Sequence, residues 1–138
     1  MKHFLIIVLS ILSISFYAQD SDGWTKEADN FLKSGNAKYA LGDYKGAIAD
    51  FNRSIELWPS ATAYNDRANA KAKLEDYYSA IKDYNRALRF SRKYYRAYIG
   101  RGLAKNNIAD KKGACLDWAK AVSLGDEEGK ALISKYCK

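Results

Sequence analysis

Histidine, proline and methionine each occur only once in this chain of 138 residues. The single histidine, His3, lies at the extreme N-terminus, so the rest of the chain lacks the commonest general base and the imidazole ligands of zinc sites. Nucleophile elbows, phosphate-binding glycine loops and EF-hand loops are also missing from the sequence. Adjacent carboxylates such as Glu75 and Asp76 point apart on a helix, which does not suit acid–base chemistry. These absences argue against an enzyme and predict no metal and no cofactor.

Charges are missing from the stretch 4–17, which follows Lys2 and precedes Ala18. A basic start, a short apolar run and a small residue before the cut are typical of a secretory signal peptide. A membrane anchor is the alternative, but the run is shorter than the roughly 20 residues that cross a bilayer. We therefore expect residues 1–18 to be a cleaved signal peptide. The mature protein should be exported, periplasmic or secreted, and should have no stable membrane span.

Basic residues are concentrated in one block, residues 86–112, which holds nine lysines and arginines and one acidic residue. Such a block can attract phosphates, acidic proteins or anionic lipids. The simpler interpretation, which we favour, is a solvated face of helices. Nucleic acid is not an expected partner of an exported protein.

Similar residues recur along the chain at a step of 33 and then of 34. A regular period of this length indicates stacked helical units, each of which needs its neighbours to bury its apolar face. Residues at equivalent positions of the three units form columns, and four of these columns hold an aromatic residue, a small residue, an aspartate and an alanine. In that order they are Phe31, Tyr64, Tyr98; Gly35, Ala68, Gly102; Asp43, Asp76, Asp110; and Ala47, Ala80, Ala114.

Each unit has the pattern of two helices joined by a turn at the recurring aspartate. In the second unit, Ala80, Tyr84 and Leu88 follow a helical rhythm after Asp76. Small residues allow the two helices to approach closely, with aromatic residues beside them. Aspartates and basic residues three positions apart predict solvent-facing i, i+3 ion pairs within the second helices. These expected pairs are Asp50–Arg53, Asp83–Arg86 and Asp117–Lys120.

The period and its small and aromatic columns resemble the tetratricopeptide repeat. The run from Gly42 through Ala47 to Pro59 is especially similar to that family's pattern, and the end of the chain resembles small secreted bacterial proteins with these repeats. The resemblance implies an all-α, right-handed α-solenoid of three helix pairs with a C-terminal capping helix. The expected segments are a signal peptide (1–18), a lead-in to the first helix (19–27), three repeats (28–60, 61–94 and 95–128) and the capping helix (129–138).

The family's concave groove, lined by the first helix of each pair, implies a function in binding a peptide or protein partner without catalysis. Several groove positions hold asparagine, whose amide can pair with any extended peptide backbone. A glycan or peptidoglycan binder is the alternative, because some aromatic residues lie outside the repeat columns. The groove residues expected to bind are Asn36, Tyr39, Asn65, Asn69, Lys73, Arg96, Asn106 and Asn107.

One subclass of the family grips a terminal carboxylate with lysine, arginine and asparagine side chains. The corresponding positions here are Leu32, Asn36, Asp66, Arg96 and Gly100. Asn36 fits, Arg96 fits loosely, and Asp66 would repel a carboxylate. We therefore do not expect that ligand.

The two cysteines, Cys115 and Cys137, predict a disulfide in an exported protein. Cys115 lies before a turn near Gly125 and Cys137 a similar distance after it, so antiparallel helices would bring the two together. The alternative is a buried Cys115 and a free terminal thiol at Cys137.

Overall fold

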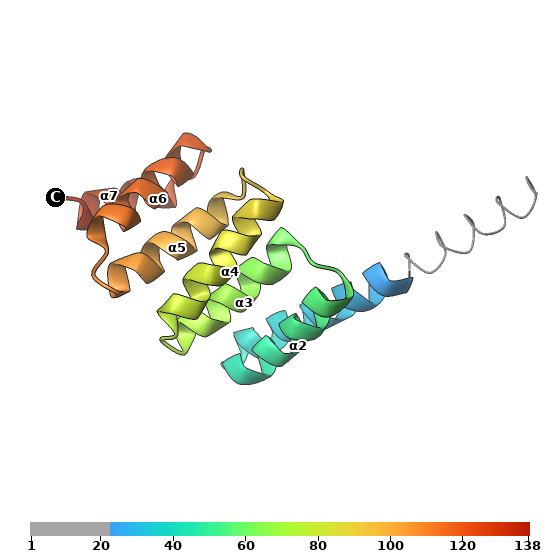
Figure 1. The fold of residues 1–138 in the computed structure, drawn as a ribbon. Helices are drawn as coiled ribbons and strands as arrows, with labels where there is room; N and C mark the ends of the chain where they lie inside the picture. Colours follow the sequence, from blue (N-terminus) through green and yellow to red (C-terminus); the bar gives the residue numbers. More distant parts are fainter. Residues whose placement is uncertain (1–22) are drawn as a thin grey trace, which may run out of the picture.

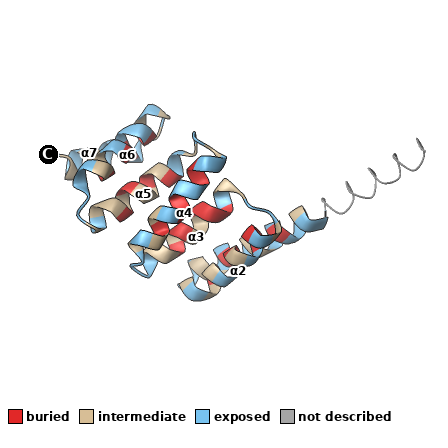
Figure 2. Cartoon of the chain, viewed as in Figure 1, coloured by how far each residue is buried: buried red, intermediate tan, exposed pale blue. Residues whose placement is uncertain are grey.

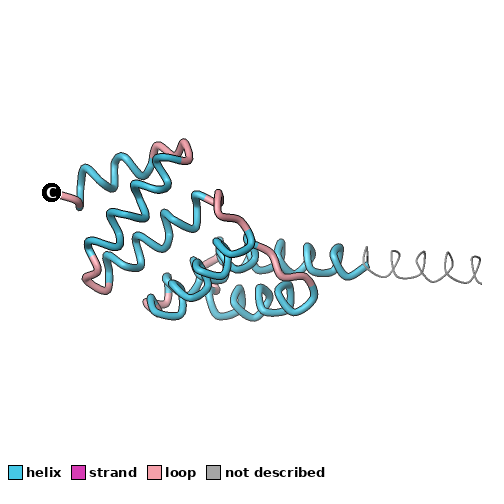
Figure 3. The backbone as a smooth tube through the Cα atoms, turned by 45° about the horizontal axis from the view of Figure 1, so that its top comes forward, coloured by secondary structure: helices cyan, strands magenta, loops and turns pink. Residues whose placement is uncertain are grey.

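The computed structural model describes residues 23–138. The expected signal peptide, its cleavage site and His3 lie outside this part of the chain. Within residues 23–138 every regular element is an α-helix, and short loops join the helices (Figure 3).

The helices form antiparallel pairs that stack side by side from the N-terminal to the C-terminal end of the described chain (Figure 1). Residues 23–40 form the first helix, so residues 23–27 are already helical rather than a lead-in to it. The predicted all-α solenoid of three helix pairs with a capping helix is confirmed. The remaining helices are α2 (Tyr44–Leu57), α3 (Ala61–Lys73), α4 (Tyr77–Phe90), α5 (Tyr95–Asn107), α6 (Lys111–Ser123) and α7 (Glu128–Tyr136).

The recurring aspartates begin the second helix of each pair by capping its N-terminus. The side chains of Asp43, Asp76 and Asp110 accept hydrogen bonds from backbone N–H groups three residues later, at 2.9, 3.3 and 2.9 Å. Each cap satisfies a backbone donor that has no partner within the helix. The residue before each cap has a positive φ, which turns the chain sharply between the two helices of a pair. In the second and third pairs this residue is Glu75 or Ala109 rather than glycine.

The buried residues lie mainly on the facing sides of the helices (Figure 2), and the core combines large aromatic side chains with small residues. The rings of Phe51, Tyr84 and Trp118 are almost completely buried, one in each pair. A Cβ added to Gly35 would lie 2.5 Å from Cε1 of Phe51, so this position has no room for a side chain. The predicted close approach of helices at the small columns is confirmed.

The expected i, i+3 ion pairs are wrong: the aspartates of the second helices pair with basic residues of the first helices. Asp83 of α4 forms ion pairs with Arg67 and Lys71 of α3, with 2.7 Å between the nitrogen and oxygen atoms in each. The third unit repeats the arrangement: Asp117 of α6 forms ion pairs with two residues of α5, Arg101 at 2.6 Å and Lys105 at 2.9 Å. The aspartates are buried, and a buried carboxylate requires a cation close by.

Each arginine of this arrangement also bonds to the preceding pair. Arg67 donates to the side-chain oxygen of Asn52 in α2, and Arg101 donates to that of Asn85 in α4, both at 2.7 Å. Because one guanidinium has donors in several fixed directions, a single side chain joins three helices. The ion pairs therefore hold the units in register as well as closing each pair.

The capping helix α7 packs on α6 at the C-terminal end of the stack. Asp126 caps it by accepting from the N–H of Gly129 at 2.8 Å. Tyr136 lies against the buried ring of Trp118, with 5.6 Å between ring centroids. The structure joins Cys115 and Cys137 in a disulfide with 5.9 Å between the Cα atoms, the pairing predicted from the sequence.

Candidate functional site

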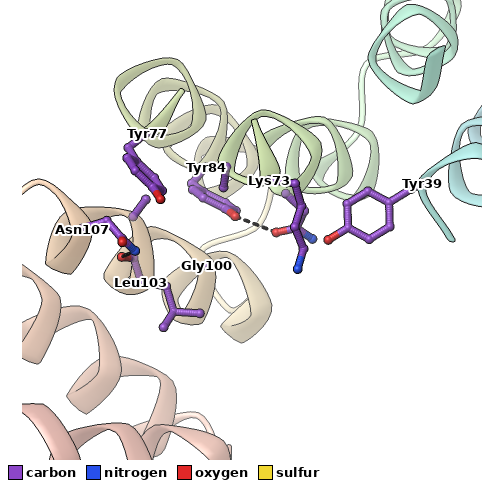
Figure 4. Close-up of a pocket in the computed structure, with 10 residues that line it drawn as sticks. Tyr39, Lys73, Tyr77, Tyr84, Gly100, Leu103 and Asn107 are labelled. Atoms are coloured by element: carbon purple, nitrogen blue, oxygen red, sulfur yellow. Dashed lines mark hydrogen bonds between the residues drawn. The ribbon is translucent and has the colours of Figure 1, made fainter. Parts of the chain in front are cut away.

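The concave surface holds two adjoining cavities, lined mainly by the first helices of the pairs. The first, which we call the tyrosine cavity, has a volume of about 380 Å³ and contains Tyr39, Tyr77 and Tyr84 (Figure 4). Lys73 of α3 and Asn107 of α5 also line it, from opposite sides. The cavity therefore draws side chains from all three helix pairs, as a binding groove requires.

Tyr84 connects the floor of the tyrosine cavity to α3. Its hydroxyl donates to the side-chain oxygen of Asn69 at 2.6 Å (Figure 4). Burial, reinforced by nearby ionisable groups such as Tyr39 and Asp66, raises the pKa of Tyr84 well above its ordinary value. The hydroxyl is therefore neutral at physiological pH and serves as a fixed hydrogen-bonding group.

The second cavity, which we call the Asp66 cavity, has a volume of about 430 Å³ and lies between α3, α5 and the start of α7. Asn69 lines both cavities, as do Gly100 and Leu103, so the two form one continuous concave surface. The charged groups of the Asp66 cavity are Asp66, Asp126, Glu128 and Arg96. Carboxylates therefore outnumber cations on its walls.

Asp66 is partly buried and holds two asparagine amides. Asn65 donates to one of its oxygens at 3.1 Å and Asn36 to the other at 3.2 Å. Burial raises the pKa of Asp66, and these two hydrogen bonds with the charge of Arg96 offset only part of that rise. No ion pair is formed by Asp66 within residues 23–138, in contrast to Asp83 and Asp117.

Most residues predicted to bind do lie on the concave surface, in different parts of it. Four line the tyrosine cavity and three the Asp66 cavity, with Asn69 in both. Asn36 reaches the same region through its bond to Asp66. Asn106 lines neither cavity, and the amide of its neighbour Asn107 donates to the carbonyl of Leu103 at 2.9 Å. The tyrosine cavity contains Tyr39, Asn69, Lys73 and Asn107, and the Asp66 cavity contains Asn65, Asn69 and Arg96.

The binding role expected of the asparagines stays a prediction, and the structure adds that three of them also bond within the protein. Asn65 is only 2% exposed, and Asn36, Asn65 and Asn69 already have side-chain partners in the protein. One end of each amide is therefore used within the groove itself: the nitrogens of Asn36 and Asn65 donate to Asp66, and the oxygen of Asn69 accepts from Tyr84. Sequence reasoning missed Tyr77 and Tyr84 as lining residues, because they belong to the second helix of a pair and the groove was assigned to first helices only.

The basic block divides into two parts in the structure. Arg101 and Lys105 are engaged in the ion pairs with Asp117, so they are not part of a solvated face. Arg86 and Arg89 lie on the outside of α4, beside an exposed Phe90, around a separate hollow of about 420 Å³. The block is therefore partly structural.

No cluster of three or more potential metal ligands occurs within the described part of the chain. Among the same residues, 23–138, no helix is long and apolar enough to cross a membrane.

Two curated relatives illustrate the similarity in sequence. A mouse protein, DnaJ homolog subfamily C member 7, is 26% identical over 114 residues, which cover 82% of this chain and 23% of the relative. The rat protein Sperm-associated antigen 1 is 41% identical over 54 residues, 36% of this chain and 6% of the relative. The chain thus spans about a quarter or less of the length of these relatives.

Solved structures match much more completely. The TPR domain of Arabidopsis OM64 superposes with a TM-score of 0.80 at 25% identity, covering 82% of this chain and 96% of that one. The Sgt2 TPR domain from Aspergillus fumigatus gives 0.78 at 26% identity, covering 81% and 78%. The first TPR of Spaghetti (RPAP3), bound to the HSP90 peptide SRMEEVD, gives 0.79 at 24% identity, covering 82% and 92%.

The sequences of the first two helix pairs also match a known repeat family. Residues 28–60 and 61–94 each match the sequence pattern of the tetratricopeptide repeat, the first two units predicted from the period. The third helix pair, α5 and α6, continues the same stacking and the same ion-pair arrangement. The chain therefore contains tetratricopeptide repeats and has the fold of a tetratricopeptide-repeat solenoid.

Proposed function

We propose that this protein is a non-catalytic interaction scaffold that holds an extended segment of a protein partner along its concave surface. The observation that carries the proposal is the pair of adjoining cavities lined by all three helix pairs. A similar domain, the second TPR domain of human RPAP3, is solved in complex with an HSP70 peptide, at 25% identity and a TM-score of 0.75, which supports a peptide-binding role.

The chemistry of the groove argues against a terminal carboxylate as the bound group. Asp66 places a carboxylate at one clamp position, where it would repel the ligand. Gly100 stands at another, and a Cβ there would lie 2.5 Å from the Tyr84 ring and hydroxyl. A basic side chain at this position would first have to displace a buried tyrosine. The partner of this chain therefore differs from the carboxylate-ended peptides of that subclass.

Export through the N-terminal segment is the second part of the proposal, and it places the scaffold in the envelope or outside the cell. The uncharged run of residues 4–17 and the disulfide of Cys115 and Cys137 support it. N-terminal sequencing of protein recovered from the producing cell tests this part. We expect the mature chain to begin at Gln19, and an N-terminus at Met1 would refute cleavage.

Site-specific photo-crosslinking in the producing cell tests the scaffold function. A photoreactive residue replaces Lys73, an exposed side chain that lines the tyrosine cavity. The matched control replaces Lys82, which is also exposed but lies on α4 outside both cavities. We expect a discrete crosslinked protein from position 73 and not from position 82. Equal labelling from both positions, or none from either, would contradict the proposal.

A further inference from the structure

The Asp66 cavity contains a buried polar atom without a partner. The side-chain oxygen of Asn65 makes no hydrogen bond within the described chain, although the residue is only 2% exposed. The orientation of this amide follows from its neighbour, because its nitrogen donates to the carboxylate of Asp66, which accepts only. Asn65, a residue of the cavity wall, therefore keeps a buried oxygen without a donor, and such an atom is costly unless something donates to it.

The charged groups that line the same cavity are mainly negative. Asp66 neighbours Asn65 on α3, while Asp126 and Glu128 approach from the start of α7. Arg96 is the one cationic group among the residues lining the cavity, and it is exposed. Burial raises the pKa of Asp66, and the charge of Arg96 together with the hydrogen bonds from the two asparagines does not fully offset this rise. The negative charge of Asp66 is therefore incompletely compensated. The buried Asp83, with two basic partners, has the compensation that Asp66 lacks.

We propose that the Asp66 cavity binds a cationic side chain of the partner segment, a lysine or an arginine, through Asp66 and the free oxygen of Asn65. An ammonium or guanidinium group carries several N–H donors and a positive charge, which match an unpaired carboxylate beside an unpaired amide oxygen. This inference rests on the proposed function, because it names the part of the partner that the groove selects. It requires a basic residue in the bound segment, where a clamp for terminal carboxylates requires an acidic end.

A mixed library of nonapeptides, acetylated at the N-terminus and amidated at the C-terminus, tests the inference on the immobilised full-length protein. Blocking both ends removes terminal amines and carboxylates, so any charge preference comes from side chains. We expect the retained peptides to be enriched in lysine or arginine at one position. If no peptide is retained, the groove function itself fails. If peptides are retained without basic enrichment, or with acidic enrichment, the function stands and the cation site is refuted.

The best retained sequence is then made in four forms, with lysine, arginine, ε-acetyl-lysine or glutamate at the selected position. The lysine and arginine forms identify which cation is preferred. We expect the acetyl-lysine form, which keeps an N–H donor but loses the charge, to bind at least about tenfold more weakly, the loss expected for one charge-assisted hydrogen bond. Equal binding of the lysine and acetyl-lysine forms would overturn the proposal without any change to the protein.

Asp66→Asn provides the complementary test on the protein. We expect it to remove the preference for lysine over acetyl-lysine while retaining the rest of the peptide affinity. Glu75→Gln is the matched control, because it removes the same charge from an exposed turn outside the cavity. Loss of the lysine preference in both variants, or in neither, would refute the assignment to Asp66. The four peptide forms on the unaltered protein decide the matter should Asp66→Asn fail to fold.

Discussion

Replacement of Asp83 by asparagine tests the central claim about stability, that buried ion pairs between helices hold the repeats together. The Asp83 side chain is 3% exposed, and its partners Arg67 and Lys71 are 13% and 21% exposed. Removing the carboxylate leaves two poorly hydrated cations side by side. Breaking such a pair costs about 3–5 kcal/mol of the free energy of unfolding. We expect about 3 kcal/mol, because Lys71 has some access to water, and a fall in melting temperature of about 10 °C.

The matched control is Asp50→Asn in the first repeat. Asp50 accepts from Ser34 at 2.6 Å and pairs with Lys38 at 2.8 Å, but Lys38 is 41% exposed. A pair this accessible contributes about 0–1 kcal/mol, since water screens it. Urea unfolding of both variants, followed by circular dichroism, measures the difference. Equal losses in Asp50→Asn and Asp83→Asn would refute the argument that burial of the pair decides its contribution.

The same pair predicts a pH dependence with a definite sign. Burial raises the pKa of Asp83, but hydrogen bonds and charges from Arg67 and Lys71 outweigh it and hold the pKa below the ordinary value of 3.8. A carboxyl whose pKa is lower in the folded state stabilises the protein above its unfolded pKa, and this contribution is lost as pH falls through the folded value. The stability difference between the unaltered protein and Asp83→Asn should therefore be full above about pH 4 and should shrink at lower pH.

Two further predictions concern the disulfide and the core. Cys115→Ser should lower the free energy of unfolding by about 3 kcal/mol, because the unfolded chain gains entropy when the loop closed by the disulfide, with a sequence separation of 22, is released. Urea unfolding under non-reducing conditions measures this loss, and an unchanged midpoint would contradict it. Gly35→Ala should cost about 1–3 kcal/mol, because the new methyl group overlaps the Phe51 ring, whereas Gly23→Ala, which meets nothing within 4 Å, should not destabilise the protein; equal melting temperatures for the two variants would contradict the packing argument.

The period of the sequence was sufficient to predict the helix pairs and their stacking. Columns of small and aromatic residues record contacts between neighbouring helices, and Phe51 against Gly35 shows the contact that the pattern implies. The disulfide followed from the antiparallel arrangement of two helices joined by a short turn. These features depend on local periodicity and chain geometry, which a single sequence contains.

The ion pairs were not predicted correctly, because spacing on one helix does not show which face a charge occupies. Asp83 and Arg86 are three residues apart, yet Asp83 points toward α3 and bonds to Arg67. A signal was present in the sequence, since Arg67 and Lys71 recur as Arg101 and Lys105 at the step of 34. A basic residue that repeats on the first helix together with an aspartate on the second is therefore a candidate for a pair between the two helices.

The same reasoning, applied to residues that do not repeat, distinguishes the candidate site from the scaffold. The positions equivalent to Asn65 in the neighbouring units are Leu32 and Ile99, which are apolar, as a position packed between helices should be. Stability alone would favour an apolar residue here too, since the Asn65 oxygen is buried without a partner. Positions where a sequence departs from its own structural rule, without a compensating contact, are expected at sites of function. A cation delivered by a partner supplies the missing compensation for Asn65 and Asp66 together, so the irregularity in the repeat and the chemistry of the cavity have one explanation.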